Sequence, residues 1–201
     1  MKRIKYIRTV VILLTSINAF AQSRNYKTKT AKDGRTTVKY ELVKEEEGTH
    51  FYYVAQTTAN ISLDELDAYF SNTNNHKKFL KRTPVTQEIE KISGKEWLAY
   101  YYFDAPWPMA DSDIVIKIDR VKKDDILIFT ATAVSNDYKQ EDVKRMANYK
   151  VVYEFKKVYP DITKITYTAD YVPVGYVPNL LAKMWFPEGP ANIVNNIGAT
   201  K

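Results

Sequence analysis

The chain has 201 residues, 45% of them hydrophobic and 13% aromatic, with no cysteine and two histidines. This length supports one domain with a substantial core, and without thiols the usual zinc ligand sets cannot form, so we expect neither a metal nor another cofactor. The formal charge is +6, but four of the thirty basic residues precede position 9, where no acidic residue lies, and without them it is +2. This near balance argues against a nucleic-acid partner.

The N-terminus has the pattern of a secretory signal peptide. Its basic residues precede an apolar run at 10–21 that ends in Ala19-Phe20-Ala21, an A-x-A cleavage site. The run is about half as long as a bilayer-spanning helix. The alternative is a short membrane anchor; a lipoprotein anchor would need a cysteine after the cleavage site. We predict a signal peptide at 1–21, a mature domain at 22–201, and a periplasmic or extracellular location.

The first half of the mature chain predicts a hairpin and two helices. Alternating polar and apolar residues indicate strands at 35–43 and 49–61, joined by an acidic turn. Ser62 and Glu65 have the spacing of a capping box at the start of a helix over 62–72. A second short helix is expected at 75–81, and we interpret the basic cluster at 76–82 as its solvated end.

The second half predicts a meander of strands and a terminal helix. Six segments with period-two alternation are expected as strands, at 85–92, 96–103, 113–121, 126–134, 149–158 and 162–172. Their short connections favour antiparallel neighbours. A helix over 177–198 would place Leu180, Leu181, Met184 and Trp185 on one face, and Pro187 and Pro190 should kink or interrupt it.

This order of elements predicts an α+β fold. We expect a curved antiparallel sheet of about eight strands wrapped around a long C-terminal helix, with a helix pair between the second and third strands. Where the terminal helix fills the concave face only partly, a cavity remains.

The stretch "APWPMADSDIV" at 105–115 resembles the Pro-Trp-Pro-x-x-x-Arg-Asp-aliphatic motif of START (steroidogenic acute regulatory-related lipid transfer) domains, which belong to the helix-grip superfamily. "KDGRTTVKY", "SLDELDAYF" and "ADYVPVGYVPNLLAKM" match in the same order, so the resemblance extends over 26–197. It implies an exported bacterial monomer that binds or transfers one lipid-like or sterol-like ligand without catalysis and contacts membranes transiently. The ligand would lie in an internal cavity closed by the terminal helix and the Pro-Trp-Pro loop.

Combined with strand alternation, the resemblance gives twelve candidate ligand-binding residues. They are Tyr101, Phe103, Trp107, Met109, Ile116, Thr130, Tyr153, Phe155, Tyr167, Leu180, Met184 and Trp185. Hydroxyl groups, including that of Thr132, are the expected polar contacts, but a slip of one residue in any strand would turn these side chains to solvent.

Two features of the motif affect the ligand. Ser112 stands where the family has an arginine, so that arginine's role cannot be transferred here, and a cavity without its charge favours neutral ligands. The two prolines restrict the loop around Trp107. Trp107 can form an apolar rim, plug the core beneath the loop, or do both; we favour a ring packed under the loop with one edge at the rim.

Catalytic patterns are weak. His50 and His76 have no nucleophile-elbow motif nearby, no glycine-rich phosphate loop is present, and the Asp111/Asp113 and Glu88/Glu90 pairs fit a turn and an exposed strand face. We therefore predict no catalytic residue. Two alternatives stay open: a cyclase-like enzyme of the same superfamily with Asp170 as acid–base residue, and a module whose groove binds a peptide or a membrane surface, which an exposed apolar patch would favour.

Overall fold

A computed structural model describes residues 24–46, 48–139 and 143–200. The predicted signal peptide lies outside these residues. None of the helices in the described ranges has both the length and the apolar character needed to cross a bilayer.

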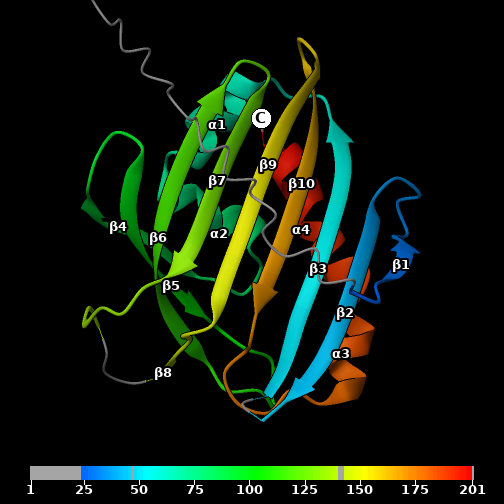
Figure 1. Ribbon diagram of the computed structural model, residues 1–201, viewed down its shortest axis with the longest axis vertical. Helices are drawn as coiled ribbons and strands as arrows, with labels where there is room; N and C mark the ends of the chain where they lie inside the picture. Colours follow the sequence, from blue (N-terminus) through cyan, green and yellow to red (C-terminus); the bar gives the residue numbers. More distant parts are fainter. Residues whose placement is uncertain (1–23, 47, 140–142, 201) are drawn as a thin grey trace, which may run out of the picture.

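The described chain forms one curved sheet of ten strands (Figure 1). Its order is β1-β2-β3-β10-β9-β7-β6-β5-β4, with β8 paired to β6, and every pairing except β6–β8 is antiparallel. The strands are β1 Lys27–Thr30, β2 Thr37–Glu45, β3 Gly48–Ala59, β4 Val85–Lys91, β5 Glu96–Phe103, β6 Ser112–Lys123, β7 Ile126–Ala133, β8 Lys144–Arg145, β9 Tyr149–Tyr159 and β10 Ile162–Tyr171. The predicted eight strands are confirmed; β1 and β8, which are short and polar, carry no alternation that could have revealed them.

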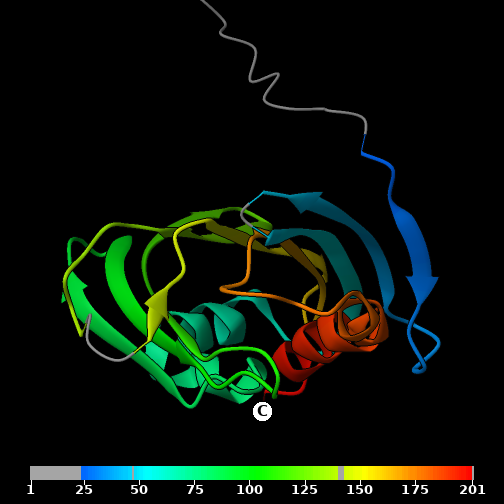
Figure 2. The ribbon, with the colours of Figure 1, turned by 90° about the horizontal axis from the view of Figure 1, so that it is seen from below.

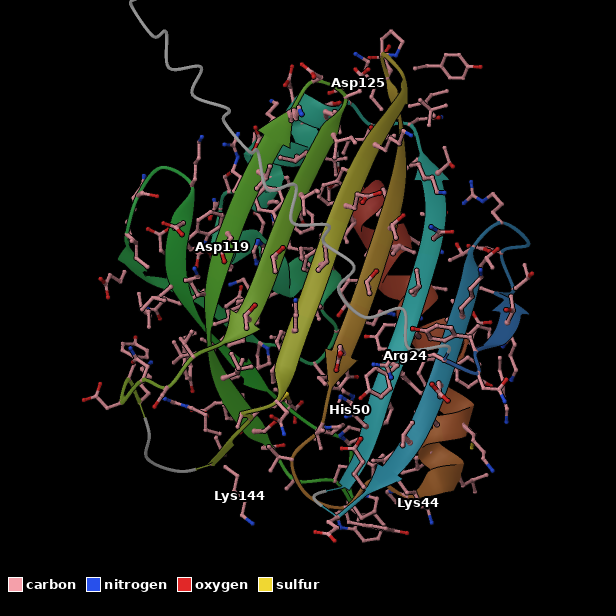
Figure 3. The ribbon with its side chains drawn as sticks, in the orientation of Figure 1. Arg24, Lys44, His50, Asp119, Asp125 and Lys144 are labelled. Carbon is pink, nitrogen blue, oxygen red and sulfur yellow. The ribbon has the colours of Figure 1, made fainter. Side chains whose placement is uncertain are left out.

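The sheet curves around the helices, which all lie on its concave side (Figure 2). They are α1 Leu63–Phe70, the single 3₁₀ turn η1 Thr73–Asn75, α2 His76–Phe79, α3 Asn179–Trp185 and α4 Glu188–Gly198. Large apolar side chains at alternate strand positions point toward these helices, and polar side chains cover the convex side (Figure 3). The concave face is therefore where a core or a ligand can be enclosed.

Helix α1 begins with the predicted capping box. The Ser62 hydroxyl accepts a hydrogen bond from the Glu65 amide, and the Glu65 carboxylate accepts one from the Ser62 amide at 2.9 Å. At the other side of the helix, Arg120 Nε on β6 donates to Asp67 Oδ1 at 2.6 Å. The capping box stabilises the start of α1, and the contact between Arg120 and Asp67 fixes the helix against the sheet.

The basic cluster after α1 is not wholly solvated, which corrects one expectation. His76 is buried, and both of its ring nitrogens have partners. Nε2 lies 2.8 Å from the Phe70 carbonyl oxygen, and Nδ1 contacts the Tyr101 hydroxyl. Burial, partly opposed by the Phe70 hydrogen bond, lowers the pKa of His76 to about 4. The imidazole is thus neutral at physiological pH; Nε2–H donates to Phe70, and Nδ1 accepts from Tyr101.

The terminal helix is two helices rather than one long one. The chain leaves helical geometry at Phe186, and Pro187 is the N-cap of α4. Pro190 lies in the first turn of α4, where the helix needs no donor from it, so only Pro187 marks the break. Helix α4 lies close against β3: a methyl group on Gly198 would be 2.6 Å from Ala59 Cβ.

The turn at 31–36 anchors α4. Its Asp33 carboxylate accepts hydrogen bonds from the Thr36 amide at 2.8 Å and from Asn195 Nδ2 on α4 at 2.7 Å. Burial raises the pKa of Asp33, but the hydrogen bonds from Thr36, Arg35 and Asn195 outweigh it and hold the pKa below its ordinary value. The "KDGRTTVKY" segment therefore holds the terminal helix in place.

Candidate functional site

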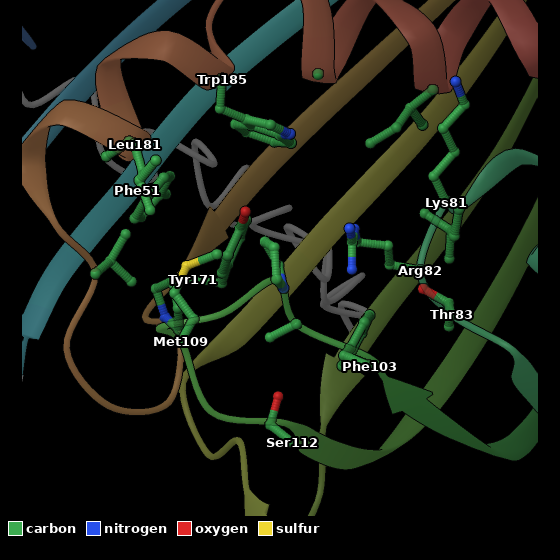
Figure 4. Close-up of a pocket in the computed structure, with 18 of the residues that line it drawn as sticks. Phe51, Lys81, Arg82, Thr83, Phe103, Met109, Ser112, Tyr171, Leu181 and Trp185 are labelled. Atoms are coloured by element: carbon green, nitrogen blue, oxygen red, sulfur yellow. The ribbon is translucent and has the colours of Figure 1, made fainter.

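A cavity of about 700 Å³ lies between the concave face and helices α3 and α4 (Figure 4). One wall is formed by β3, β9 and β10, a second by the two helices, and the end by the Pro-Trp-Pro loop and the segment that follows α2. The volume is within the range of about 300 to 1,000 Å³ that small-molecule sites have.

The sheet wall is aromatic. Phe51 and Tyr53 come from β3, Tyr149 from β9, and Tyr167 and Tyr171 from β10. The register explains their proximity, because Tyr167 pairs with Tyr153, and Tyr171 with Tyr149, across the β9–β10 ladder. Figure 4 shows the side chain of Tyr171 directed into the cavity.

The tyrosine hydroxyls on this wall meet one another. Tyr53 donates to the hydroxyl of Tyr167 at 3.3 Å. Burial raises the pKa of Tyr167, while hydrogen bonds from Tyr53, Tyr153 and Tyr149 oppose that rise. Burial likewise raises the pKa of Tyr171. All these hydroxyls are protonated at neutral pH, so the wall offers polar contacts without charge.

The helix wall centres on Trp185 of α3. Its indole packs edge-on against Tyr53, with ring centroids 5.3 Å apart, and against Phe51 at 6.2 Å. Space for it depends on Gly189, because a methyl group there would lie 2.0 Å from the indole Nε1. Leu181, Ala182 and this glycine complete the apolar surface.

Asp111 holds the Pro-Trp-Pro loop: it accepts hydrogen bonds from the Tyr102 hydroxyl at 2.7 Å and from the Ala105 amide at 2.9 Å. Met109 and Trp107 contribute to the cavity wall. Trp107, however, is 91% exposed, so it forms part of an open rim. This corrects our expectation of a ring packed beneath the loop.

The position of the motif's arginine faces the cavity. Ser112 lines it, and Figure 4 shows the hydroxyl directed toward its interior. The next residue, Asp113, is buried and forms a two-pronged ion pair with Arg145 of β8, with distances of 3.0 Å from Nε to Oδ1 and 2.7 Å from Nη2 to Oδ2. The aspartate of the motif thus has a basic partner, and it comes from another strand.

Charged side chains also line the cavity. Lys81, Arg82 and Glu188 contribute to its lining. The Arg82 side chain is 56% exposed and its Nη1 lies 3.8 Å from Asp104 Oδ2, while Glu188 accepts a hydrogen bond from the Lys32 amide at 3.0 Å. Lys81 and Arg82 belong to the segment after α2, and Glu188 is the first residue of α4, so none of these charges comes from the sheet wall.

The cavity brings together half of the twelve candidate residues. Those lining it are Phe103, Trp107, Met109, Tyr167, Met184 and Trp185. Tyr101, Ile116, Tyr153 and Phe155 are buried in the core but do not line the cavity. Thr130, like Thr132, alternates with the inward-facing Phe129 and Ala131, so both threonines point to the convex side, and Leu180 is turned to solvent. For Thr130 the strand parity was wrong; for Leu180 the helix face was wrong.

Asp170, the acid–base candidate, also faces away from the cavity. Its Oδ1 lies 2.6 Å from Nε2 of His50, which Figure 3 shows on the convex side, and His50 Nδ1 is 3.2 Å from Glu45 Oε1. The described residues contain no group of acidic or histidine side chains arranged to hold a metal ion.

Several lining residues were missed from the sequence. Tyr149 and Tyr171 have the same strand parity as Tyr153 and Tyr167, so alternation could have identified them. Phe51 is likewise in phase with Tyr53. No sequence signal separates those that line the cavity from those that fill the core, because this depends on where the helices lie.

The sequence matches no protein-family model. It is 22% identical over 172 residues to an uncharacterized protein of Pseudomonas aeruginosa, covering 79% of this chain and 84% of that one.

The fold is similar to that of many solved structures, among them the following three. A STAR-related lipid transfer protein of Xanthomonas axonopodis has a TM-score of 0.72 at 17% identity, with 88% of this chain and 98% of that chain covered. Human StAR-related lipid transfer protein 5 has a TM-score of 0.70 at 14% identity, covering 89% and 86%. A Streptomyces aromatase/cyclase has a TM-score of 0.53 at 8% identity, covering 74% and 92%. The chain therefore has the START helix-grip fold.

Proposed function

We propose that the protein binds or transfers a hydrophobic, lipid-like or sterol-like ligand in the cavity without catalysis. The observation that carries this proposal is a cavity of about 700 Å³, walled by aromatic and aliphatic side chains, in the fold of STAR-related lipid-transfer domains. Apolar burial at about 25 cal/mol per Å² would drive binding.

An enzymatic role has less support. The fold also occurs in an aromatase/cyclase, but the proposed acid, Asp170, is on the convex side and bonded to His50. Glu188 is the carboxylate that the described residues place at the cavity, and the Lys32 amide already binds it. Acid–base chemistry would need a group positioned to reach substrate, and the sheet wall supplies only tyrosine hydroxyls.

Transient membrane contact is part of the proposal. Four exposed apolar side chains lie on the segments that border the cavity, and we call them the apolar lip: Trp107, Tyr176, Leu180 and Met184, whose exposed fractions are 91%, 78%, 69% and 68%. Two of them, Trp107 and Met184, also line the cavity. The loops that carry Trp107 and Tyr176 meet beside the lip, where a methyl group on Gly175 would lie 3.9 Å from Ala110 Cβ. A ligand could pass across this lip from a membrane without crossing water.

Export through the N-terminal segment at 1–21 completes the proposal, with the domain acting as a monomer in the periplasm or outside the cell. Its support is the pattern of basic residues, apolar run and A-x-A site alone.

The binding test uses N-phenyl-1-naphthylamine, an uncharged apolar fluorophore whose emission rises on leaving water. Saturable binding is expected for the wild-type chain, and Ser112→Leu, which fills the cavity from its end, should weaken it at least tenfold. Ser135→Leu, at an exposed loop position, is the matched control and should bind as the wild type does. Equal binding by both variants would show that the fluorophore occupies another site.

A further inference from the structure

The cavity's sheet wall carries a tyrosine hydroxyl cluster, formed by Tyr53, Tyr149, Tyr153, Tyr167 and Tyr171. Four of them line the cavity, and Tyr153 lies beneath them. Tyr53 donates to Tyr167 at 3.3 Å, and the Tyr153 ring stacks on that of Tyr167 with centroids 4.8 Å apart. The members come from three adjacent strands, so the sheet itself holds the cluster in place.

The number of donors in the cluster exceeds the number that its own bonds use. The hydroxyl of Tyr53 donates its proton to that of Tyr167 at 3.3 Å, so Tyr167 accepts in this bond and keeps its own proton. Each hydroxyl has one proton to donate. A line of hydroxyls in which each donates to the next ends in one whose proton has no acceptor inside the cluster, so an O–H is left to donate to a ligand.

A buried donor that faces an apolar cavity favours a ligand that supplies an acceptor, because a buried polar group without a partner is costly. The same burial disfavours an ionised partner, since no cation belongs to the cluster and a charged head would lose its hydration without compensation. The acceptor that fits is an uncharged oxygen.

We propose, on the premise of the proposed function, that the ligand has an apolar body with an uncharged hydroxyl or carbonyl oxygen at one end. This oxygen accepts a hydrogen bond from the tyrosine hydroxyl cluster, and the body extends along Trp185 toward the apolar lip.

The rival arrangement places a carboxylate of the ligand against Lys81 and Arg82. Arg82 is more than half exposed and lies near Asp104, so an anion there would remain partly hydrated and compete with an existing partner. The two arrangements predict different ligand heads, and the experiment must separate them.

The experiment measures displacement of N-phenyl-1-naphthylamine by hexadecane, 1-hexadecanol and palmitate, which share a chain length and differ in the head. Tyr167→Phe removes the central hydroxyl of the cluster. Tyr171→Phe removes one at its edge and serves if the first variant fails to fold. Tyr40→Phe is the matched control, because Tyr40 is a buried strand tyrosine outside the cavity that stacks on Phe186 at 4.2 Å. Arg82→Gln tests the rival.

We expect Tyr167→Phe to weaken the binding of 1-hexadecanol by about tenfold, which corresponds to one net hydrogen bond. The affinity for hexadecane should be unchanged. Tyr171→Phe should have a smaller effect in the same direction, and Tyr40→Phe none. Equal changes for the alkane and the alcohol, or none for either, would overturn the inference and leave the proposed function standing. The inference would also be overturned if palmitate bound more tightly than 1-hexadecanol and if Arg82→Gln weakened the binding of palmitate. Failure of the fluorophore and all three probes to bind would overturn the proposed function as well.

Discussion

The two halves of the concave face are built from the same strands but filled differently. In the packed half, Phe70 of α1 lies against Phe79, Tyr153 and Phe155, with ring centroids 4.9, 5.0 and 4.9 Å apart. In the open half, β9 and β10 present Tyr149 and Tyr171 to a cavity. The strands continue from one half into the other, so the difference comes from the helices.

Helix α1 fills its half because a single side chain, Phe70, packs against aromatic rings of both β7 and β9. The terminal helices leave theirs open because the chain breaks at Pro187. This break separates α3 from α4, and α3 turns Leu180 to solvent and leaves Met184 largely exposed where it lines the cavity. The packed half stabilises the fold, and the open half provides the candidate site.

The largest effect is expected in the packed half. Phe70→Ala should lower the free energy of unfolding by about 3 to 5 kcal/mol, because a fully buried ring is lost and a cavity left behind. Urea denaturation at pH 7 measures this. Trp185→Ala, the matched change in the open half, should cost less, since its ring already faces empty space; equal losses would contradict the division into halves.

The sequence was sufficient to predict which strands form the concave face. It did not show where the packed half ends and the open half begins. Period-two alternation placed Tyr153, Phe155 and Tyr167 on one face of the sheet, and all three are buried there. The prediction for Thr130 was wrong because its strand, "ILIFTATAV", has apolar residues at enough consecutive positions to allow either face to point inward. The sequence could not show that Phe70 covers Tyr153 while Tyr149 stays uncovered, because that depends on contacts between residues 63–70 and 149–155.

The pH dependence of stability tests the contact between α2 and the sheet, because the imidazole of His76, the first residue of α2, contacts the Tyr101 hydroxyl. The pKa of His76 is about 4 in the folded protein and about 6.5 in the unfolded chain, so the unfolded state binds more protons between these values. The stability from neutral His76 is complete above pH 6.5 and is lost as the pH falls toward 4. Between pH 7 and pH 5 the loss should be about 2 kcal/mol.

Urea midpoints at the two pH values, in wild type and His76→Gln, isolate this contribution. Glutamine can replace both hydrogen bonds but does not titrate, so its midpoint should change less with pH. The same slope in both proteins would assign the pH dependence to other groups.

Glycine substitutions probe the open half. Gly189→Ala should force the Trp185 indole to move, at a cost of about 1 kcal/mol in unfolding free energy, and it should weaken fluorophore binding several-fold. Gly94→Ala is the matched control, because a methyl group there meets no atom within 4 Å. Unchanged binding by Gly189→Ala would mean that Trp185 does not shape the ligand site.

The smallest effect on stability is expected at the lip. Trp107→Ala should change the free energy of unfolding by less than about 0.5 kcal/mol, since the ring is almost fully exposed. It should nevertheless slow ligand transfer between vesicles. Tyr159→Ala, an exposed aromatic outside the lip, controls for loss of any surface ring. Unchanged transfer by Trp107→Ala would remove the lip from the proposed route.

The central claim is that the open half holds a hydrophobic ligand, and native mass spectrometry of the chain purified from its own host tests it most directly. We predict an adduct of lipid-like mass on the wild-type protein, absent or strongly reduced in Ser112→Leu and retained in Ser135→Leu. A wild-type spectrum with no adduct, together with no shift in melting temperature across a panel of lipids and sterols, would contradict the claim.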